Sequence, residues 1–113
     1  MTGDWDGNGT TTIGLYEPSG GNWALRNANS GGSPQIAFQY GGSIWANPVT
    51  GDWDGNKTTT IGVYALSSGI WRLRNSNTAG NANVEFQYGG PLWGPISGDW
   101  NGDGVDTVAV ATR

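Results

Sequence analysis

The sequence predicts an all-β fold whose four-stranded antiparallel sheets are arranged as β-propeller blades. The motif Gly-Asp-Trp occurs at residues 3–5, 51–53 and 98–100, so the chain repeats with a period of about 48 residues. Each full repeat contains short segments in which apolar and polar residues alternate, which is typical of half-buried strands. Four such strands in one period match a propeller blade. A β-sandwich is the alternative, but it has no reason to repeat at this period.

The strands follow one another at similar places in both repeats. In the first repeat they are expected at residues 12–16, 23–26 and 36–40, with a short strand around 48–50 leading into the second Gly-Asp-Trp. The short strand that leads into Gly-Asp-Trp is the first strand of the next blade. The second blade therefore has strands at 49–53, 58–65, 71–75 and 84–88. Clusters of Gly, Asn, Ser, Asp and Pro separate them and predict turns. No stretch shows the 3.6-residue periodicity of a helix of a dozen residues.

The repeats divide the chain into three parts. Residues 3–50 are expected to form the first blade repeat and residues 51–97 the second. Residues 98–113 hold the first two strands of a third repeat. Because Met1 stands directly before a repeat, we expect a fragment that was excised or engineered from a longer propeller.

The composition excludes several classes of protein. The chain has 113 residues with no cysteine and no histidine, which excludes disulfides, zinc sites of the usual kind and Ser-His-Asp chemistry. Its formal net charge is −4 and its five basic residues are not clustered, so nucleic acid is not an expected partner. No apolar run is long enough to insert into a membrane, and no signal peptide is expected at the N-terminus.

The segment Gly-Asp-Trp-Asp-Gly-Asn-Gly-Thr-Thr-Thr-Ile-Gly-Leu-Tyr at residues 3–16 resembles the FG-GAP/VCBS repeats of integrin-α-like propellers. Residues 49–64, 71–75 and 98–104 fit the same scheme, and the resemblance covers essentially the whole chain. It implies a propeller of about seven blades in typical members and a parent protein that is extracellular or at the cell surface. It also implies a role in adhesion or ligand binding, without naming the ligand.

The resemblance further implies that the loop after the first strand of each blade can hold calcium. No cofactor is required, and calcium is the one that could be present. The candidate side chains are Asp4, Asp6, Asn8, Asp52, Asp54, Asn56, Asp99, Asn101 and Asp103. Threonine replaces the closing carboxylate in each loop, at residues 12, 60 and 107, so we expect weak binding that is strongest in the third loop. The alternative is that these residues only form Asx turns.

The tryptophans fall into two groups. Trp5, Trp53 and Trp100, together with Trp23 and Trp71, are expected to pack between blades. Trp45 and Trp93 lie in loops that connect successive blades. There they can either stack on a sugar ring or cap the seam between two blades, and both readings stay open. Asn22 could reach the same surface, whereas Arg26 and Arg74 are expected to be solvated or paired between blades.

The sequence bears on three classes of function. Catalysis is not expected, because Glu17 and Glu85 are the only acids outside the turns and neither recurs in the other repeat. A lectin-like module that binds carbohydrate is the first hypothesis, with the ligand at Trp45, Trp93 and Asn22. A purely structural or designed scaffold, with calcium bound only structurally if at all, is the alternative.

The chain is expected to associate with itself. Two blades and a fraction cannot close a ring, so a free chain exposes blade faces at both ends. Three chains with two blades each would give six blades, and four chains would give eight. Residues 98–113 either replace the matching hairpin of a neighbour or complete the neighbour's partial blade.

Overall fold

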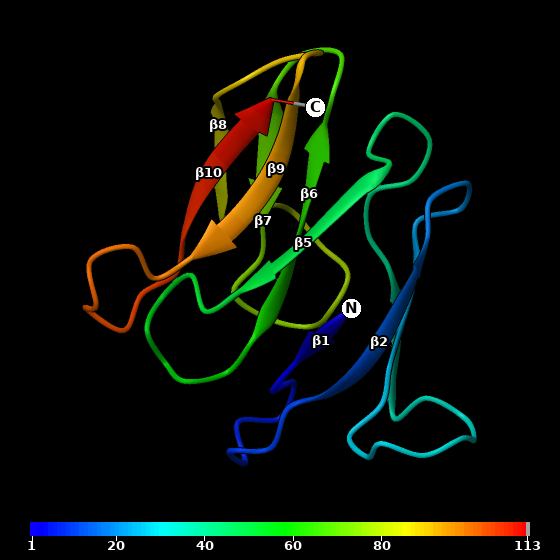
Figure 1. Cartoon of the computed structure of the whole chain (residues 1–113). Coiled ribbons are helices and arrows are strands. Elements are labelled where there is room, and N and C mark those ends of the chain that lie inside the picture. Colours follow the sequence, from blue (N-terminus) through cyan, green and yellow to red (C-terminus); the bar gives the residue numbers. More distant parts are fainter. Residues whose placement is uncertain (113) are drawn as a thin grey trace.

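The computed structural model describes residues 1–112, which form ten strands and no helix (Figure 1). The strands make two four-stranded sheets and one two-stranded sheet, all antiparallel. The predicted all-β class and the four-stranded antiparallel units are therefore confirmed. No helix in the described part of the chain could cross a membrane.

The first sheet contains β1 (Thr2–Gly3), β2 (Thr12–Glu17), β3 (Asn22–Leu25) and β4 (Ile36–Gln39), paired in that order. The second sheet contains β5 (Asn47–Gly51), β6 (Thr60–Ala65), β7 (Ile70–Leu73) and β8 (Val84–Gln87), also in chain order. The C-terminal hairpin consists of β9 (Trp93–Gly98) and β10 (Thr107–Thr112). The predicted strands lie within a few residues of the observed ones, and each sheet begins a few residues before its Gly-Asp-Trp motif.

Matching aromatic residues lie opposite one another in both four-stranded sheets. In the first, the Tyr16 ring centroid lies 4.5 Å from that of Trp23, and Trp23 stacks on Phe38 at 6.1 Å. Tyr64, Trp71 and Phe86 repeat the arrangement in the second sheet. These cross-strand pairs favour the observed register, because a shift of one residue would move the aromatic rings to the other face.

Each sheet packs one face against the second strand of the next sheet. In the first core cluster, Ile61 and Val63 of β6 pack with residues of the first sheet. In the second cluster, Val108 and Val110 of β10 pack against residues of the second sheet. The first-sheet members are Trp5, Trp23, Leu25 and Tyr40, and the second-sheet members are Val49, Trp53, Tyr64, Trp71 and Leu73. The first strands of successive sheets are also neighbours, with β1 beside β5 and β5 beside β9 (Figure 1).

The prediction that tryptophans pack between units is confirmed for four residues and stays a prediction for the fifth, which has no further unit of this chain beside it. Trp5, Trp23, Trp53 and Trp71 are buried in the two clusters. Trp100 is 57% exposed, because no described residue packs on that face of the C-terminal hairpin. The tryptophan of the Gly-Asp-Trp motif is therefore buried in two copies and exposed in the third.

The connecting loops divide between the two ends of the sheets. The loops at residues 4–11 and 26–35 meet at one end, where Asn29 Nδ2 donates to the Thr11 carbonyl. Asn77 makes the matching contact with Thr59 in the second sheet. The loop that carries Trp45 lies at the other end, where Tyr40 N donates to the Gly21 carbonyl. The Asp-rich loops and the tryptophan loops thus lie at opposite ends, as expected for up-and-down sheets.

Candidate ligand-binding groove between the two sheets

An open groove lies along the seam between the first and second sheets. One part has a volume of about 360 Å³ and is lined by residues that include Gln39, Tyr40, Trp45 and Arg72. The adjoining part, of about 380 Å³, is lined by residues that include Asn81 and Glu85. Tyr40, Arg72 and Gly80 line both parts, so we treat them as one site and call it the inter-sheet groove.

Trp45 is held at the groove by its own loop. The Trp45 N–H donates to the Gly42 carbonyl at 2.7 Å, and the Tyr16 hydroxyl donates to the Trp45 carbonyl at 2.7 Å. Gly41 has a φ of +95°, and a Cβ there would stand 2.7 Å from the Tyr16 hydroxyl oxygen. The loop therefore needs glycine at this position, both for its backbone conformation and for the close approach of Tyr16.

Arg72 comes from β7 of the second sheet and lies over the Trp45 ring. Its guanidinium carbon is 4.4 Å from the ring centroid, which is a cation–π contact across the seam. Arg72 Nε also pairs with Glu85, the residue opposite it on β8. Both side chains are about half exposed, so this ion pair adds little stability and mainly sets the orientation of the guanidinium. Within the described residues, the two terminal nitrogens of Arg72 form no hydrogen bond.

Tyr40 follows β4 and lies between the two parts of the groove. Its side chain is buried, with 9% of its surface exposed, and its hydroxyl has no hydrogen-bond partner among the described residues. Burial raises the pKa of Tyr40 above its ordinary value, and the nearby charges of Arg74 and Arg72 partly offset this. The phenol is therefore neutral at physiological pH and can both donate and accept. A buried hydroxyl without a partner costs about 1–3 kcal/mol, which a bound polar group would recover.

The groove combines the groups that recognise a polyhydroxylated ligand. The indole of Trp45 supplies an apolar wall, and Arg72 supplies two donors in fixed planar geometry. Tyr40 and Glu85 add a donor–acceptor hydroxyl and an acceptor carboxylate. Because Arg72 covers one face of the indole, that face is not open to a stacking sugar ring as the sequence hypothesis supposed.

The three residues expected to bind a ligand lie in different surroundings. Trp45 lines the inter-sheet groove. Trp93 begins β9 and is exposed beside Gly89, where an added Cβ would meet Tyr64 and Val110 as one at Gly41 would meet Tyr16 and Val63. The hairpin has no strand that could supply a counterpart of Arg72 there. Asn22 begins β3, donates to Glu17 Oε1 at 2.7 Å and does not line the groove.

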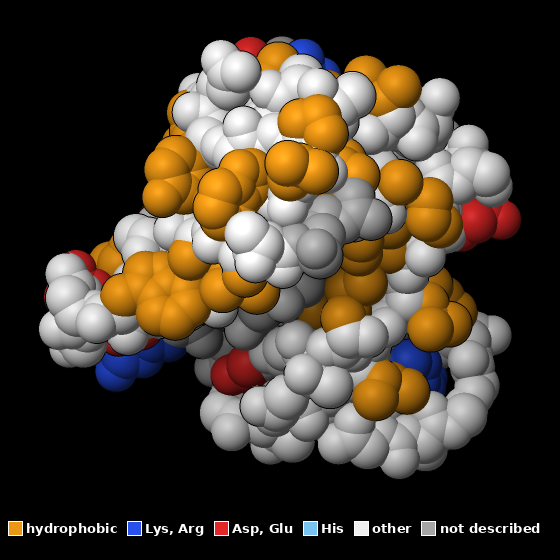
Figure 2. Space-filling view, turned by 45° about the horizontal axis from the view of Figure 1, so that its top comes forward, with side chains coloured by type: hydrophobic (Ala, Val, Ile, Leu, Met, Phe, Trp, Pro, Cys, Tyr) orange, Lys and Arg blue, Asp and Glu red, His pale blue; other side chains and the backbone are white. Residues whose placement is uncertain are grey.

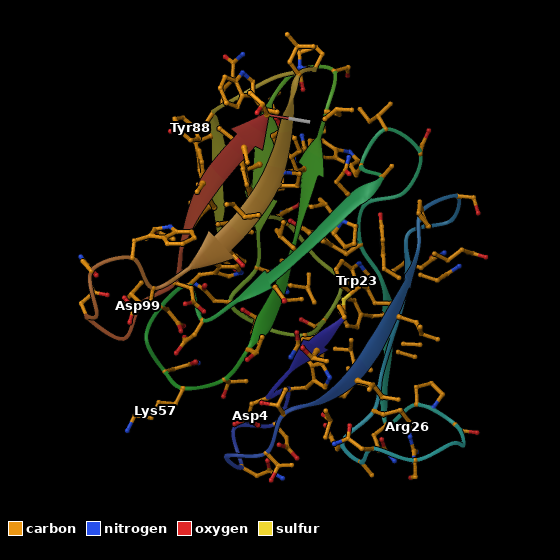
Figure 3. The ribbon with its side chains drawn as sticks, viewed as in Figure 1. Asp4, Trp23, Arg26, Lys57, Tyr88 and Asp99 are labelled. Carbon is orange, nitrogen blue, oxygen red and sulfur yellow. The ribbon has the colours of Figure 1, made fainter. Side chains whose placement is uncertain are left out.

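The Asp-rich loops are organised by their own backbone. Asp4, Lys57 and Asp99 mark the three loops in Figure 3. In the first loop, Asp4 accepts from the Asn8 and Gly9 N–H groups, Asp6 accepts from Asn8 N, and Asn8 accepts from Thr10 N. The other two loops repeat this pattern with Asp52, Asp54, Asn56, Asp99, Asn101 and Asp103 as acceptors.

The contacts that span two residues are Asx turns, and the first Asp of each loop accepts from N–H groups four and five residues on. Together they account for the Asp and Asn side chains without a metal. No group of three or more carboxylate, His or Cys side chains in residues 1–112 is placed to hold a metal ion. Backbone hydrogen bonds, foremost that from Gly104, lower the pKa of Asp99 below its ordinary value. Calcium binding stays a prediction.

Arg26 and Arg74 are partly exposed and hold loops within their own sheets, so the expectation that they are paired between blades is wrong. Arg26 donates to the carbonyls of Ser30, Gly31 and Ser33. Arg74 donates to those of Thr78, Ala79 and Asn81. Each guanidinium therefore closes the loop after the third strand of its sheet, which satisfies carbonyls that would otherwise lie open.

Sequence reasoning missed Tyr40, Arg72 and Glu85 as members of a site. A signal was present for two of them, because Arg72 and Glu85 replace Ala24 and Ala37 of the first repeat. Two charged residues that appear together at opposed strand positions indicate a paired feature specific to one repeat. No such signal exists for Tyr40, which is matched by Tyr88.

Comparisons of the chain with protein-family models, with curated proteins and with solved structures found no match. The resemblance to FG-GAP/VCBS repeats therefore rests on the motifs of the sequence.

Proposed function

We propose that this chain is a non-enzymatic β-propeller module that binds carbohydrate in the inter-sheet groove. The observation that carries the proposal is that Tyr40, whose buried hydroxyl lacks a hydrogen-bond partner, lines the same groove as Arg72 and Trp45. A sugar hydroxyl in the groove would pair with one or both terminal nitrogens of Arg72. It would satisfy the buried Tyr40 hydroxyl once the groups that cover that hydroxyl move aside. The ligand would contact the edge of Trp45, or it would displace Arg72 from the ring face.

The arrangement of the sheets supports the propeller part of the proposal. Each sheet packs on the second strand of the next, and the first strands β1, β5 and β9 lie side by side. Blades that radiate from a common axis have both properties, because their innermost strands meet around it. An extracellular location and a role in adhesion follow from the FG-GAP/VCBS resemblance and belong to the same proposal.

A scaffold without a ligand is the second candidate, and the contact between Arg72 and Trp45 favours it. A guanidinium that covers an indole across a seam stabilises the packing of two sheets without any further partner. In that case the Tyr40 hydroxyl would be satisfied by water.

A glycan array followed by calorimetric titration of the purified chain distinguishes the two candidates. Tyr40→Phe removes only the hydroxyl, and we expect it to weaken glycan binding about tenfold, as the loss of a buried hydrogen bond does. Tyr88→Phe is the matched control at the same position of the second repeat, where the side chain is exposed, and it should bind as the unmodified chain does. Absence of any glycan signal, or equal loss in both variants, would reject the groove as a carbohydrate site.

A further inference from the structure

Successive sheets are joined by the same backbone link in two places. At the first junction, Thr59 N donates to the Asp4 carbonyl at 2.9 Å, and Asp4 N donates to Thr59 Oγ1 at 3.0 Å. At the second, Asp106 N donates to the Asp52 carbonyl at 2.8 Å, and Asp52 N donates to Asp106 Oδ2 at 2.7 Å. We call this pair of hydrogen bonds the junction clip.

The clip has one unused half at each end of the chain. Thr11 stands where Thr59 and Asp106 stand in the later repeats, and it retains the hydroxyl that Thr59 uses. Asp99 stands where Asp4 and Asp52 stand. Both residues are exposed, and neither forms a clip within the described part of the chain. Thr11 and Asp99 are therefore complementary halves of a contact that the molecule already makes twice.

The apolar surfaces beside these residues are complementary in the same way. Ile61 and Val63 are buried at the first junction, whereas their counterparts Ile13 and Leu15 on β2 are exposed. At the other end, Trp100 and Ile96 are exposed although Trp53 and Val49, their counterparts, are buried. Exposed apolar groups gathered in this manner indicate a protein-binding surface. Figure 2 shows hydrophobic side chains exposed over one face of the molecule.

We propose that a second copy of this chain binds end to end, with Thr11, Ile13 and Leu15 of one copy against Asp99, Trp100 and Ile96 of the other. Thr11 and Asp99 form a third junction clip. Asn29 then donates to the Trp100 carbonyl of the neighbouring copy, as Asn77 Nδ2 donates to the Trp5 carbonyl within one chain. The inference does not depend on carbohydrate binding.

The intermolecular junction is smaller than the two internal ones. The C-terminal hairpin has no counterpart of β3 or β7, so nothing replaces Trp23 and Leu25 in the contact. Association is therefore expected to be reversible and to depend on concentration. The contact is heterologous, so it leaves one end of each copy available and builds either a closed ring or an open chain.

The groove at this junction differs from the inter-sheet groove. Ala24 and Ala37 of the incoming copy stand where Arg72 and Glu85 stand in the second sheet. The intermolecular junction therefore contains no counterpart of the Arg72–Glu85 pair. Loss of assembly and loss of carbohydrate binding can consequently be observed separately.

Two variants, each blocking one end, test the proposal. Leu15→Glu and Trp100→Glu place a charge on opposite ends, at exposed positions where the fold should tolerate it. In analytical ultracentrifugation we expect the unmodified chain to form species larger than 11.8 kDa as concentration rises. Each variant alone should have a dissociation constant raised at least about tenfold. Their equimolar mixture should form a one-to-one complex and nothing larger, because only one productive pair of ends remains.

The controls make each outcome decisive. Leu92→Glu changes an exposed leucine away from both ends and should associate as the unmodified chain does. Circular dichroism verifies that each variant is folded, and Thr11→Val, which removes only the clip hydroxyl, serves as a milder second probe. A chain that stays monomeric at all concentrations, or a mixture that behaves like each variant alone, would overturn the proposal.

Discussion

Strands β2 and β6 have nearly the same sequence and very different surroundings. Their sequences are Thr-Ile-Gly-Leu-Tyr-Glu and Thr-Ile-Gly-Val-Tyr-Ala. Every residue of β6 is buried, whereas β2 alternates, with Leu15 74% exposed and its counterpart Val63 1% exposed. The difference arises because the first sheet covers β6 and no described residue covers the same face of β2. Burial in this molecule is therefore a property of the junction and not of the strand.

The tyrosines that follow the fourth strands show the reverse contrast: the copy in the first repeat is buried and the copy in the second repeat is exposed. Tyr40 is 9% exposed at the junction of the two sheets, whereas Tyr88 is 53% exposed. Tyr88 lies at the edge of the second sheet (Figure 3). The C-terminal hairpin covers the second sheet with two strands only, so it leaves Tyr88 open. Matched positions in the two repeats thus provide internal controls for the energetic value of each junction.

The largest difference is expected between the tryptophans of the repeated motif. Trp53→Ala removes a buried indole and should lower the free energy of unfolding by about 3–5 kcal/mol. Trp100→Ala changes a side chain that is 57% exposed and should lower it by less than about 1 kcal/mol. Urea unfolding at a concentration where the chain is monomeric measures both. Similar losses in the two variants would show that Trp100 is packed in solution.

A pair of isoleucines isolates the contribution of one junction. Ile61→Ala should cost about 2–4 kcal/mol, because Ile61 is buried against the first sheet. Ile13→Ala at the same strand position should cost less than about 1 kcal/mol in the monomer, since Ile13 is exposed. Thermal unfolding followed by tryptophan fluorescence reports both values. If the two costs converge as protein concentration rises, the exposed face of β2 is being covered by another copy.

The two tyrosines test whether the groove contains an unsatisfied hydroxyl. Without ligand, Tyr40→Phe should raise the free energy of unfolding by about 1 kcal/mol, because it removes a buried hydroxyl that lacks a partner. Tyr88→Phe should leave it unchanged. The pKa of Tyr40 is raised in the folded state, so ionisation favours the unfolded chain once the pH exceeds the unfolded value of about 10. The gain in stability of Tyr40→Phe over the unmodified chain should therefore grow above that pH. If Tyr40→Phe is instead less stable than the unmodified chain, the hydroxyl is bonded to a bound water.

The smallest effect is expected from calcium. Backbone N–H groups already satisfy the loop carboxylates, and the closing carboxylate is threonine in all three loops, so millimolar calcium should raise the melting temperature only slightly. Asp99→Asn should remove what stabilisation there is, and Asp4→Asn should remove less. A large shift at micromolar calcium, reversed by a chelator, would contradict this prediction.

The repeat located the strands because local patterning and turn chemistry act over a few residues. The alternation at residues 36–40 and 84–88 predicted β4 and β8 to within one residue. The loop geometry was also accessible, since Asp and Asn side chains favour hydrogen bonds to the backbone N–H two residues on. The meeting of Arg72 with Trp45 in one groove was not accessible, because this contact joins two different sheets. Nothing in either local sequence indicates the other.

By itself, the sequence determined the all-β class, the positions of the strands and the pairing of strands within each sheet. These follow from side-chain periodicity and short connections, which depend on neighbours along the chain. Only the tertiary structure decided which copy of each repeated residue is buried. Trp53 and Trp100, or Tyr40 and Tyr88, are equivalent in sequence and differ in what packs against them. Burial is set by the area that a neighbouring sheet removes from water, and that sheet lies about one repeat away along the chain.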